Sequence, residues 1–305
     1  MSVLVVGSVA LDSVETPFGK ATDVVGGSAT YFSAAASLLA PVQLVGVVGE
    51  DFPHELLDQL RRREVDLSGL ERASGASFRW RGRYRHDLSA AETLETHLGV
   101  FSQFRPKIPD SFRSAPFVFL GNIDPRLQLE VLSQVEGPKL VACDTMNFWI
   151  ESRRPELLEL LGRVDLITLN DAEARQLSDH NNLLKAARWI LGRGPKHVII
   201  KKGEHGAFMF TPRTVFFAPA YPLEDVFDPT GAGDSFAGGF MGYLARTHDL
   251  SEPNLRRAVV YGSAMGSFAV EKFSIERLLE LDHRQLRGRV AEFRRLVAFE
   301  EEIGG

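Results

Sequence analysis

Short, largely apolar runs recur along this chain, and each ends beside glycine or a polar residue. Such runs are typical of strands buried on both faces of a parallel sheet, because helices cover both of those faces. Segments with helical spacing of apolar residues lie between the later runs. We therefore predict an α/β fold with a doubly wound, mostly parallel sheet flanked by helices. The runs are residues 3–6, 43–48, 117–120, 140–143, 165–169 and 197–200.

The elements expected in the last third of the chain are of other kinds. Residues 207–210 and 214–217 predict a hairpin around Pro212. Residues 252–270 predict a helix rich in small side chains, and residues 275–302 predict a charged amphipathic helix pair. We expect the final glycines, 304 and 305, to form a disordered tail.

The composition is that of a globular protein long enough to bury a large core: 305 residues, of which 44% are hydrophobic and 25% are charged. The formal net charge of −5 argues against a nucleic-acid-binding surface. Cys143 is the only cysteine, so no intramolecular disulfide and no cysteine-based zinc site can form. No basic segment precedes the first apolar run and no run reaches membrane-spanning length, so we expect a cytoplasmic protein without membrane contact.

The stretch from Asp228 to Arg246 gives the strongest indication of chemistry. Gly231-Ala232-Gly233 precedes Asp234, and apolar residues then recur at intervals of three and four, which predicts a helix with one buried face. Small residues at a helix start let backbone N–H groups approach an anion, and the helix dipole favours negative charge there. An acidic side chain beside an anion site is nevertheless costly, because like charges repel, unless the acid is used. We therefore interpret Asp234 as a base beside a phosphate-binding loop.

Two other chemistries fit parts of the same stretch. A dinucleotide-binding fingerprint would need a third glycine where Phe236 stands, and the motif lies late in the chain. A hydrolase with Ser235 as nucleophile would need a later acid and base, for which Asp249 and His283 stand in the right order. The phosphate site with Asp234 as general base remains the leading hypothesis.

Polar residues follow several predicted strands, at the edge where ligands collect in open α/β sheets. Asp12 lies a few residues past the first strand and is either a substrate ligand or a turn aspartate. Gly26-Gly27 precedes a small-residue helix and permits either close approach of a ligand or tight helix packing. Asn170 and Glu173 stand one helical turn apart, which alone predicts an N-terminal cap and a first-turn acid.

Residues 77–84 alternate between two chemical types. Phe78, Trp80 and Tyr84 alternate with arginines, and this period of two predicts an exposed antiparallel strand with one apolar and one basic face. The apolar face would cover a ligand as a lid or form a dimer surface. Interleaved basic and aromatic side chains also suit nucleic acid, which the acidic net charge disfavours.

Three motifs together resemble those of the ribokinase (PfkB) family of carbohydrate and nucleoside kinases. Residues 228–236 closely resemble the second signature of that family, and Gly26-Gly27 with its small-residue helix resembles the first. Residues 170–173 match an Asn-x-x-Glu motif. Their order and spacing fit the family over nearly the whole chain.

The resemblance implies a kinase that uses ATP and Mg²⁺. Asp234 would accept the proton of an alcohol group that attacks the γ-phosphate, while the N–H groups of Gly231, Ala232 and Gly233 hold the developing charge. The acceptor-binding residues would be Asp12, Gly27, Ser28 and Asn147. The nucleotide-binding residues would be Asn170, Lys201, Gly203, Gly206, Thr230 and Ser263. Glu173 would organise Mg²⁺ mainly through water, and Asp228 would hold a monovalent cation such as K⁺.

The chain departs from the family pattern at three positions. Pro229 replaces a small residue, Ser263 stands where many relatives carry asparagine, and no arginine follows Asn147. We predict one ribokinase-like domain over residues 1–305, with lid segments at about 12–25 and 76–100. A homodimer through the lid is a further expectation.

The acceptor is predicted only as a class. We predict transfer of the ATP γ-phosphate to an alcohol group of a small sugar. The alternative acceptors are an adenosine-type ribonucleoside and an inositol-type cyclitol. The competing class is a non-catalytic sensor of sugar or nucleotide, which would have no need of a base such as Asp234.

Overall fold

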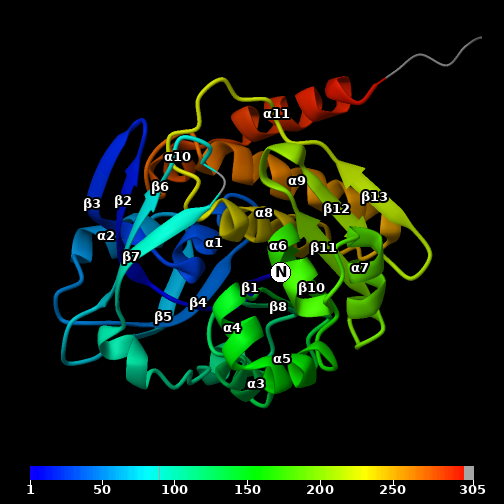
Figure 1. The fold of residues 1–305 in the computed structure, drawn as a ribbon. Coiled ribbons are helices and arrows are strands. Elements are labelled where there is room, and N and C mark those ends of the chain that lie inside the picture. Colours follow the sequence, from blue (N-terminus) through cyan, green and yellow to red (C-terminus); the bar gives the residue numbers. More distant parts are fainter. Residues whose placement is uncertain (89, 299–305) are drawn as a thin grey trace, which may run out of the picture.

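The computed structural model describes residues 1–88 and 90–298, and its largest element is a nine-stranded sheet (Figure 1). The strand order is β13-β12-β11-β10-β9-β8-β1-β4-β5. The strands from β5 to β11 run parallel, and β12 and β13 continue the sheet antiparallel. The bounds are β1 Val3–Val6, β4 Val42–Val48, β5 Val65–Arg72, β8 Phe117–Leu120, β9 Leu140–Cys143, β10 Leu166–Asn170, β11 His197–Lys201, β12 Ala207–Phe210 and β13 Val215–Ala218. The prediction of a mostly parallel sheet is confirmed.

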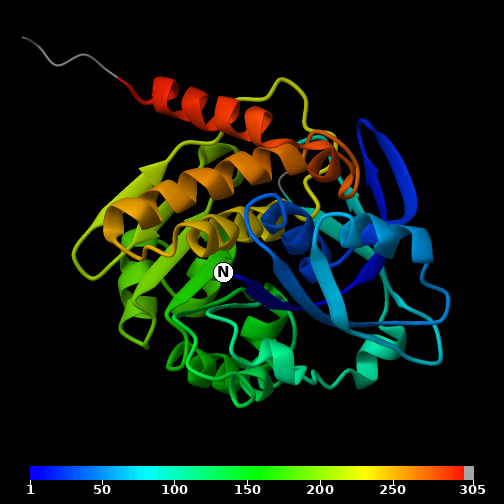
Figure 2. The ribbon, with the colours of Figure 1, turned by 180° about the vertical axis from the view of Figure 1, so that it is seen from behind.

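Helices cover both faces of this sheet (Figures 1 and 2). One layer holds α1 Ser28–Ala36, α8 Ala232–Thr247 and α9 Glu252–Ala269, and the other holds α3 Pro125–Leu132, α5 Arg154–Leu161, α6 Asp171–Ser178 and α7 Leu183–Leu191. Alternate residues of β1 serve the two layers, since Val3 and Val5 join one apolar cluster while Leu4 and Val6 join the other. The remaining helices are α2 His54–Arg61, α4 Asn147–Ser152, α10 Glu276–Glu280 and α11 His283–Leu296, with short 3₁₀ turns at Gly99–Gln103, Asp110–Phe112 and Gly203–His205.

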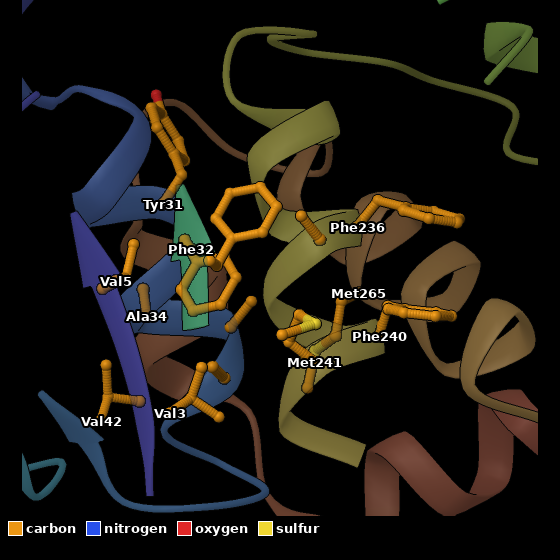
Figure 3. Close-up of a cluster of buried hydrophobic side chains, with 14 of the residues drawn as sticks. Val3, Val5, Tyr31, Phe32, Ala34, Val42, Phe236, Phe240, Met241 and Met265 are labelled. Atoms are coloured by element: carbon orange, nitrogen blue, oxygen red, sulfur yellow. The ribbon is translucent and has the colours of Figure 1, made fainter. Parts of the chain in front are cut away.

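Small residues bring α1 and α8 unusually close together. A Cβ atom on Gly238 would lie 2.3 Å from the carbonyl oxygen of Phe32 and 3.0 Å from the Cβ of Ala35. Figure 3 shows Phe32 of α1 and Met241 of α8 within the apolar cluster that also buries Val3 and Val5. The close packing places the amino end of α8 beside the amino end of α1, and thus beside the glycine pair that precedes α1.

A second, smaller sheet lies beside the large one (Figure 1). Its order is β3-β2-β6-β7, with β2 at Ala10–Thr16, β3 at Gly19–Gly26, β6 at Phe78–Tyr84 and β7 at Ala91–His97. The strand predicted at residues 77–84 is therefore present, but only part of its pairing is antiparallel. It pairs antiparallel with β7 and parallel with β2, because the long connection through β4 and β5 returns the chain in the same direction as β2.

The apolar face of β6 is used within the chain. Phe78 stacks on Phe101 with ring centroids 5.3 Å apart. The Trp80 ring lies against Gly82, where a Cβ atom would come within 2.1 Å of the ring. The Tyr84 hydroxyl accepts a hydrogen bond from Thr230 at 3.3 Å. These contacts account for the alternation without a second subunit, so the homodimer stays an untested prediction.

The final third of the chain follows the predictions closely. The hairpin, the helix after residue 252 and the charged helix pair are present as β12–β13, α9 and α10–α11. The tail at 304–305, like residues 299–302 of the predicted helix pair, lies outside the described residues. Within the described ranges, no helix is both long enough and apolar enough to cross a membrane.

Candidate active site at the amino end of α8

The loop that starts α8 has a backbone shape that glycine permits. Gly231 is the N-terminal capping residue and has a φ of 73°, in the left-handed region. A Cβ atom there would lie 2.2 Å from the Tyr31 ring. The N–H group of Ala232 closes a turn on the carbonyl of Pro229 at 3.2 Å, which differs from its predicted role as an anion donor. In the described part of the chain, the N–H groups of Gly231 and Gly233 donate to no acceptor, so these two groups are available to bind an anion.

Asp234 stands in the first turn of α8 and is half-buried. Burial and, secondarily, the carboxylate of Asp144 raise the pKa of Asp234 to about 7, while the ammonium of Lys201 opposes the shift. A carboxyl group with a pKa near neutrality is well suited to accept a proton in catalysis. The position and the electrostatics of Asp234 therefore fit the general base predicted from the sequence.

Lys201 ends β11 and reaches the same place from the sheet. Its Nζ donates to Oδ2 of Asp144 at 3.1 Å. A Cβ atom on Gly233 would lie 2.9 Å from this Nζ, so the ammonium lies against the first turn of α8. Asp144 follows β9 directly and is 5% exposed. The sequence places Asp144 at a strand end, but only the structure shows its pairing with Lys201.

Asn170 and Glu173 form a reciprocal capping box at the start of α6. The Glu173 N–H donates to Oδ1 of Asn170 at 2.8 Å, and the Asn170 N–H donates to Oε2 of Glu173 at 2.7 Å. Burial, then the carboxylate of Asp144, raise the pKa of Glu173 to about 7. The cap accounts for one carboxylate oxygen, and the other remains available to a cation or to water.

Asp12 lies in β2 opposite the glycine pair. A Cβ atom on Gly26 would lie 1.8 Å from Oδ2 of Asp12, so glycine makes room for this carboxylate. Asp12 is 4% exposed, and burial followed by the carboxylate of Asp228 raises its pKa to about 7. Gly27 has a φ of 92°. The hydroxyl groups of Ser28 and Ser8 form a hydrogen bond of 3.2 Å, which links α1 to the segment that follows β1.

Asp228 completes the group of charged residues at the amino end of α8, which is called the crevice from here on and consists of Asp12, Asp144, Glu173, Lys201, Asp228 and Asp234. Asp228 is 1% exposed and accepts hydrogen bonds from the N–H groups of Thr230 at 2.9 Å and Ser274 at 3.4 Å. Burial raises the pKa of Asp228. The Tyr31 hydroxyl is buried here without a hydrogen-bond partner among the described residues. Sequence reasoning did not identify Tyr31, because a tyrosine in an apolar helix predicts core packing.

Four other predicted residues lie at the margins of this group. Asn147 is exposed at the start of α4, and Ser263 is half-buried on α9. Gly203 begins a 3₁₀ turn with open space around it, and Gly206 has a φ of 84°. The structure gives the side chains of Asn147 and Ser263 no contact with Asp234, so their roles in binding stay predictions.

The rival chemistries do not fit the structure. Ser235 is fully buried within α8. Asp249, proposed as its acid, bonds Ser251, and His283, proposed as its base, is exposed at the start of α11. A buried serine without access to a base is no nucleophile. Phe236 occupies the helix where a dinucleotide fingerprint would need glycine.

The donor set of the crevice suits a nucleoside triphosphate with Mg²⁺. Two free N–H groups and the Lys201 ammonium offer positive charge at the α8 amino end, which matches a phosphate. Within residues 1–88 and 90–298, no three histidine, cysteine or acidic side chains are grouped to hold a metal ion directly. Glu173 has one carboxylate oxygen outside the capping box, and this oxygen fits the predicted contact to Mg²⁺ through water.

Comparisons with known proteins show the family and the fold of this chain. A family model described as pfkB family carbohydrate kinase matches residues 2–280. A cytidine kinase of Thermococcus kodakarensis is 31% identical over 258 residues, which cover 83% of this chain and 91% of that protein. The archaeal nucleoside kinase of Methanocaldococcus jannaschii, a member of the ribokinase family, has a similar structure, with a TM-score of 0.78, 21% identity and coverage of 95% of this chain and 98% of that one.

A putative ribokinase II from E. coli, solved in complex with ATP and Mg²⁺, gives a TM-score of 0.81 at 18% identity and covers 95% of this chain and 99% of that one. The two structures confirm the ribokinase-like fold predicted from the motifs. Because the family model spans most of the sequence, this chain belongs to the pfkB family of carbohydrate kinases.

Proposed function

We propose that this kinase transfers the γ-phosphate of ATP to a ribose hydroxyl of a nucleoside. The single observation that carries the reaction type is Asp234, held at the glycine-capped start of α8 beside Lys201. The acceptor class is supported by the similarity to a cytidine kinase over 83% of this chain. A nucleoside was the alternative acceptor in the sequence analysis, and this similarity moves it ahead of a free sugar.

Asp234 acts as the general base in this proposal. Its carboxylate takes the proton of the acceptor hydroxyl as the new oxygen–phosphorus bond forms and the bond from the γ-phosphorus to the bridging oxygen breaks, releasing ADP. Mg²⁺ bound with ATP neutralises charge on the phosphate oxygens. The N–H groups of Gly231 and Gly233 hold the charge that develops on the transferred group.

Asp12 orients the acceptor. Its carboxylate is buried beside Gly26 and faces the same crevice as Asp234, whose negative charge contributes to the raised pKa of Asp12. A carboxylate accepts two hydrogen bonds in fixed directions and thereby suits the paired hydroxyls of a ribose. Trp80 lies directly across from Asp12 in the register of β2 and β6, and in this proposal its ring packs on the base of the nucleoside.

The small sheet acts as a lid in this proposal. Besides the bond from Thr230 to Tyr84, the hydroxyl of Thr16 donates to the carbonyl of Phe227 at 2.8 Å. Both bonds join the small sheet to the loop that precedes α8. Movement of this sheet would therefore alter the loop that holds the phosphate.

A monovalent cation beside Asp228 is also proposed. This carboxylate is buried, and in the described part of the chain no lysine or arginine forms an ion pair with it. A bound K⁺ would offset the cost of burying the charge. Dependence of ATP turnover on K⁺, with Na⁺ at equal ionic strength as the control, tests this assignment.

A coupled assay of ADP release over nucleosides, free sugars and cyclitols tests the function. We expect the highest kcat/KM with a nucleoside. The second candidate, a sugar kinase, gains if free ribose or another sugar is the better substrate. If no acceptor supports turnover but one of them raises the melting temperature, the protein is a sensor and the proposed reaction is wrong.

A further inference from the structure

Lys201 occupies an unusual place for a lysine. It is the last residue of β11, and its side chain is 16% exposed. Burial lowers its pKa, but the carboxylates of the crevice, Asp144 foremost, raise it more, so the net shift is upward and the ammonium stays charged. The fold therefore keeps a buried cation at the start of α8, where the helix dipole by itself disfavours one.

The ammonium group of Lys201 has hydrogen-bond donors that the chain leaves unused among the described residues. An ammonium group has three donors, and in the described part of the chain only the bond to Asp144 is formed. Asp144 is itself fixed, because its other oxygen accepts from the N–H of Thr145 at 2.8 Å and its carbonyl accepts from Gln128 at 3.0 Å. One donor is thus anchored on a rigid carboxylate, and the others are free to meet an anion beside Gly233.

We propose that Lys201 contacts the phosphoryl group being transferred and that Asp144 is the positioning residue that holds it there. This inference rests on the proposed kinase reaction. The ammonium lies against Gly233 in the first turn of α8, and its charge acts on the carboxylate of Asp234, the proposed base. A lysine acts on phosphate as a point charge and gains most where charge develops.

A second lysine–carboxylate pair, next to the start of the same strand, provides a matched control. Lys196 lies just before β11, at the opposite edge of the sheet, and its Nζ is 2.8 Å from Oδ1 of Asp165. The Lys196 side chain is 73% exposed, whereas that of Lys201 is 16% exposed. Lys196→Met therefore removes a similar pair without touching the crevice.

The test compares binding of the non-hydrolysable ATP analogue AMP-PNP with binding of ADP, by calorimetry with Mg²⁺. We expect Lys201→Met to weaken AMP-PNP by at least about tenfold and ADP by less than about threefold, because the lost contact is to the terminal phosphate. Lys196→Met should change neither affinity. Equal losses for both nucleotides, or no loss, would overturn the inference.

Kinetics separate the roles of the two residues. Lys201→Met should lower kcat by about 10²–10³-fold. Asp144→Asn should lower kcat by about tenfold or more and leave KM for ATP nearly unchanged, because the lysine remains but is no longer held. If Asp144→Asn lowers only the melting temperature, the pair is structural. Lys201→Arg, which keeps the charge, should retain AMP-PNP affinity even if the methionine variant fails to fold, and loss of that affinity in a folded arginine variant would contradict the proposal.

Failure of the proposed reaction would look different. In that case the unmodified protein would phosphorylate no acceptor, while the difference between AMP-PNP and ADP in Lys201→Met would still be measurable. That difference decides the role of Lys201 by itself.

Discussion

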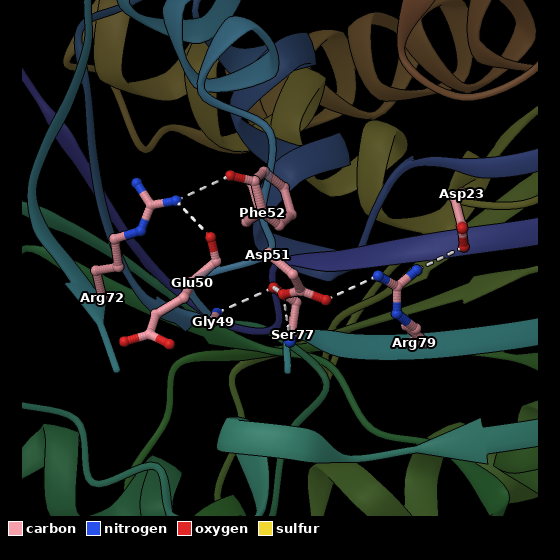
Figure 4. Close-up of polar contacts among 8 residues, drawn as sticks. All are labelled: Asp23, Gly49, Glu50, Asp51, Phe52, Arg72, Ser77 and Arg79. Carbon is pink, nitrogen blue, oxygen red and sulfur yellow. Dashed lines mark hydrogen bonds and ion pairs between the residues drawn. The ribbon is translucent and has the colours of Figure 1, made fainter. Parts of the chain in front are cut away.

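The crevice and the outer face of the small sheet are both rich in charge, but they use it in opposite ways. On the outer face, the three arginines of β6, and Arg85 just after it, each have a carboxylate partner. Figure 4 shows Arg79 between Asp23 and Asp51, at 2.7 Å from each. The other pairs are Arg81 with Glu95, Arg83 with Glu15 and Arg85 with Glu92, at 3.3, 3.3 and 3.4 Å.

In the crevice, acids gather without enough cations to match them. The pKa values of Asp12, Glu173 and Asp234 all rise to about 7, with burial as the first cause in each. Lys201 is the basic partner shown there, and it pairs with Asp144. Balanced, exposed pairs contribute little to stability, whereas unbalanced buried acids cost stability and persist where function requires them. The imbalance of charge therefore marks the candidate active site more clearly than the abundance of charge does.

Removing the proposed base should have the largest effect. We expect Asp234→Asn to lower kcat by about 10³–10⁴-fold, because the amide cannot accept the proton of the acceptor. Steady-state kinetics measure the loss, and calorimetry should show ATP binding largely intact. Near-normal turnover would remove Asp234 from this role.

A side chain added at Gly231, in the proposed phosphate-binding loop, should have the second-largest effect on kcat. Gly231→Ala forces a side chain into the Tyr31 ring and into a left-handed φ, so we expect a loss of about 1–3 kcal/mol in the free energy of unfolding and a drop of at least about tenfold in kcat. Urea denaturation and kinetics measure the two effects. Gly288→Ala in α11 is the control, since its Cβ would meet open space. If the two variants had the same free energy of unfolding and the same kcat, the expected strain at Gly231 would be contradicted.

The pH dependence of turnover should reveal the unbalanced acids. The base must be deprotonated, and the pKa of Asp234 is about 7, so kcat should fall about tenfold per pH unit below neutrality. The apparent pKa measured from this fall in kcat describes the coupled acids together, because Glu173 titrates in the same range as Asp234. A kcat that stays flat from pH 7 down to pH 5 would show that the carboxylates are ionised throughout.

Removing the charge of Asp12 should weaken acceptor binding and raise the free energy of unfolding. Its folded-state pKa of about 7 exceeds the ordinary aspartate pKa of 3.8, so its stabilising contribution is complete below pH 3.8 and is lost as the pH rises through 7. At pH 8, Asp12→Asn should therefore raise the free energy of unfolding by about 1–3 kcal/mol, while KM for the acceptor rises. Denaturation at pH 8 and pH 4 tests the sign, because the gain should vanish at pH 4.

Breaking a pair on the outer face should have the smallest effect. Arg81→Gln removes an exposed pair with Glu95, and we expect the free energy of unfolding to change by less than about 0.5 kcal/mol, with kcat unchanged. Denaturation and kinetics on this variant provide the reference for the crevice variants. If Arg81→Gln lowered the free energy of unfolding or kcat as much as Gly231→Ala, the proposed difference between the outer face and the crevice would be wrong.

Much of the fold could be predicted because its signals are local. Each four-residue apolar run of the sheet became a strand, and the capping pair of Asn170 and Glu173 formed as expected from its spacing. The strand β5 and the helix α7 went unpredicted. Arg63 ends a run of three arginines, a local pattern typical of a solvated basic face, but it donates to the carbonyls of Leu278, Leu279 and Leu281. Those acceptors lie more than 200 residues away, where no local pattern points.

The sequence by itself determined most of the elements, the glycine-capped start of α8 and the choice of Asp234 as the proposed base. Periodicity, caps and backbone conformation depend on residues a few positions apart. Only the tertiary structure decided how that base is tuned. Asp144 and Lys201 are 57 positions apart, and Tyr84 and Thr230 are 146 apart. A pKa depends on burial and on nearby charges, and both arise only when the folded chain brings distant segments together.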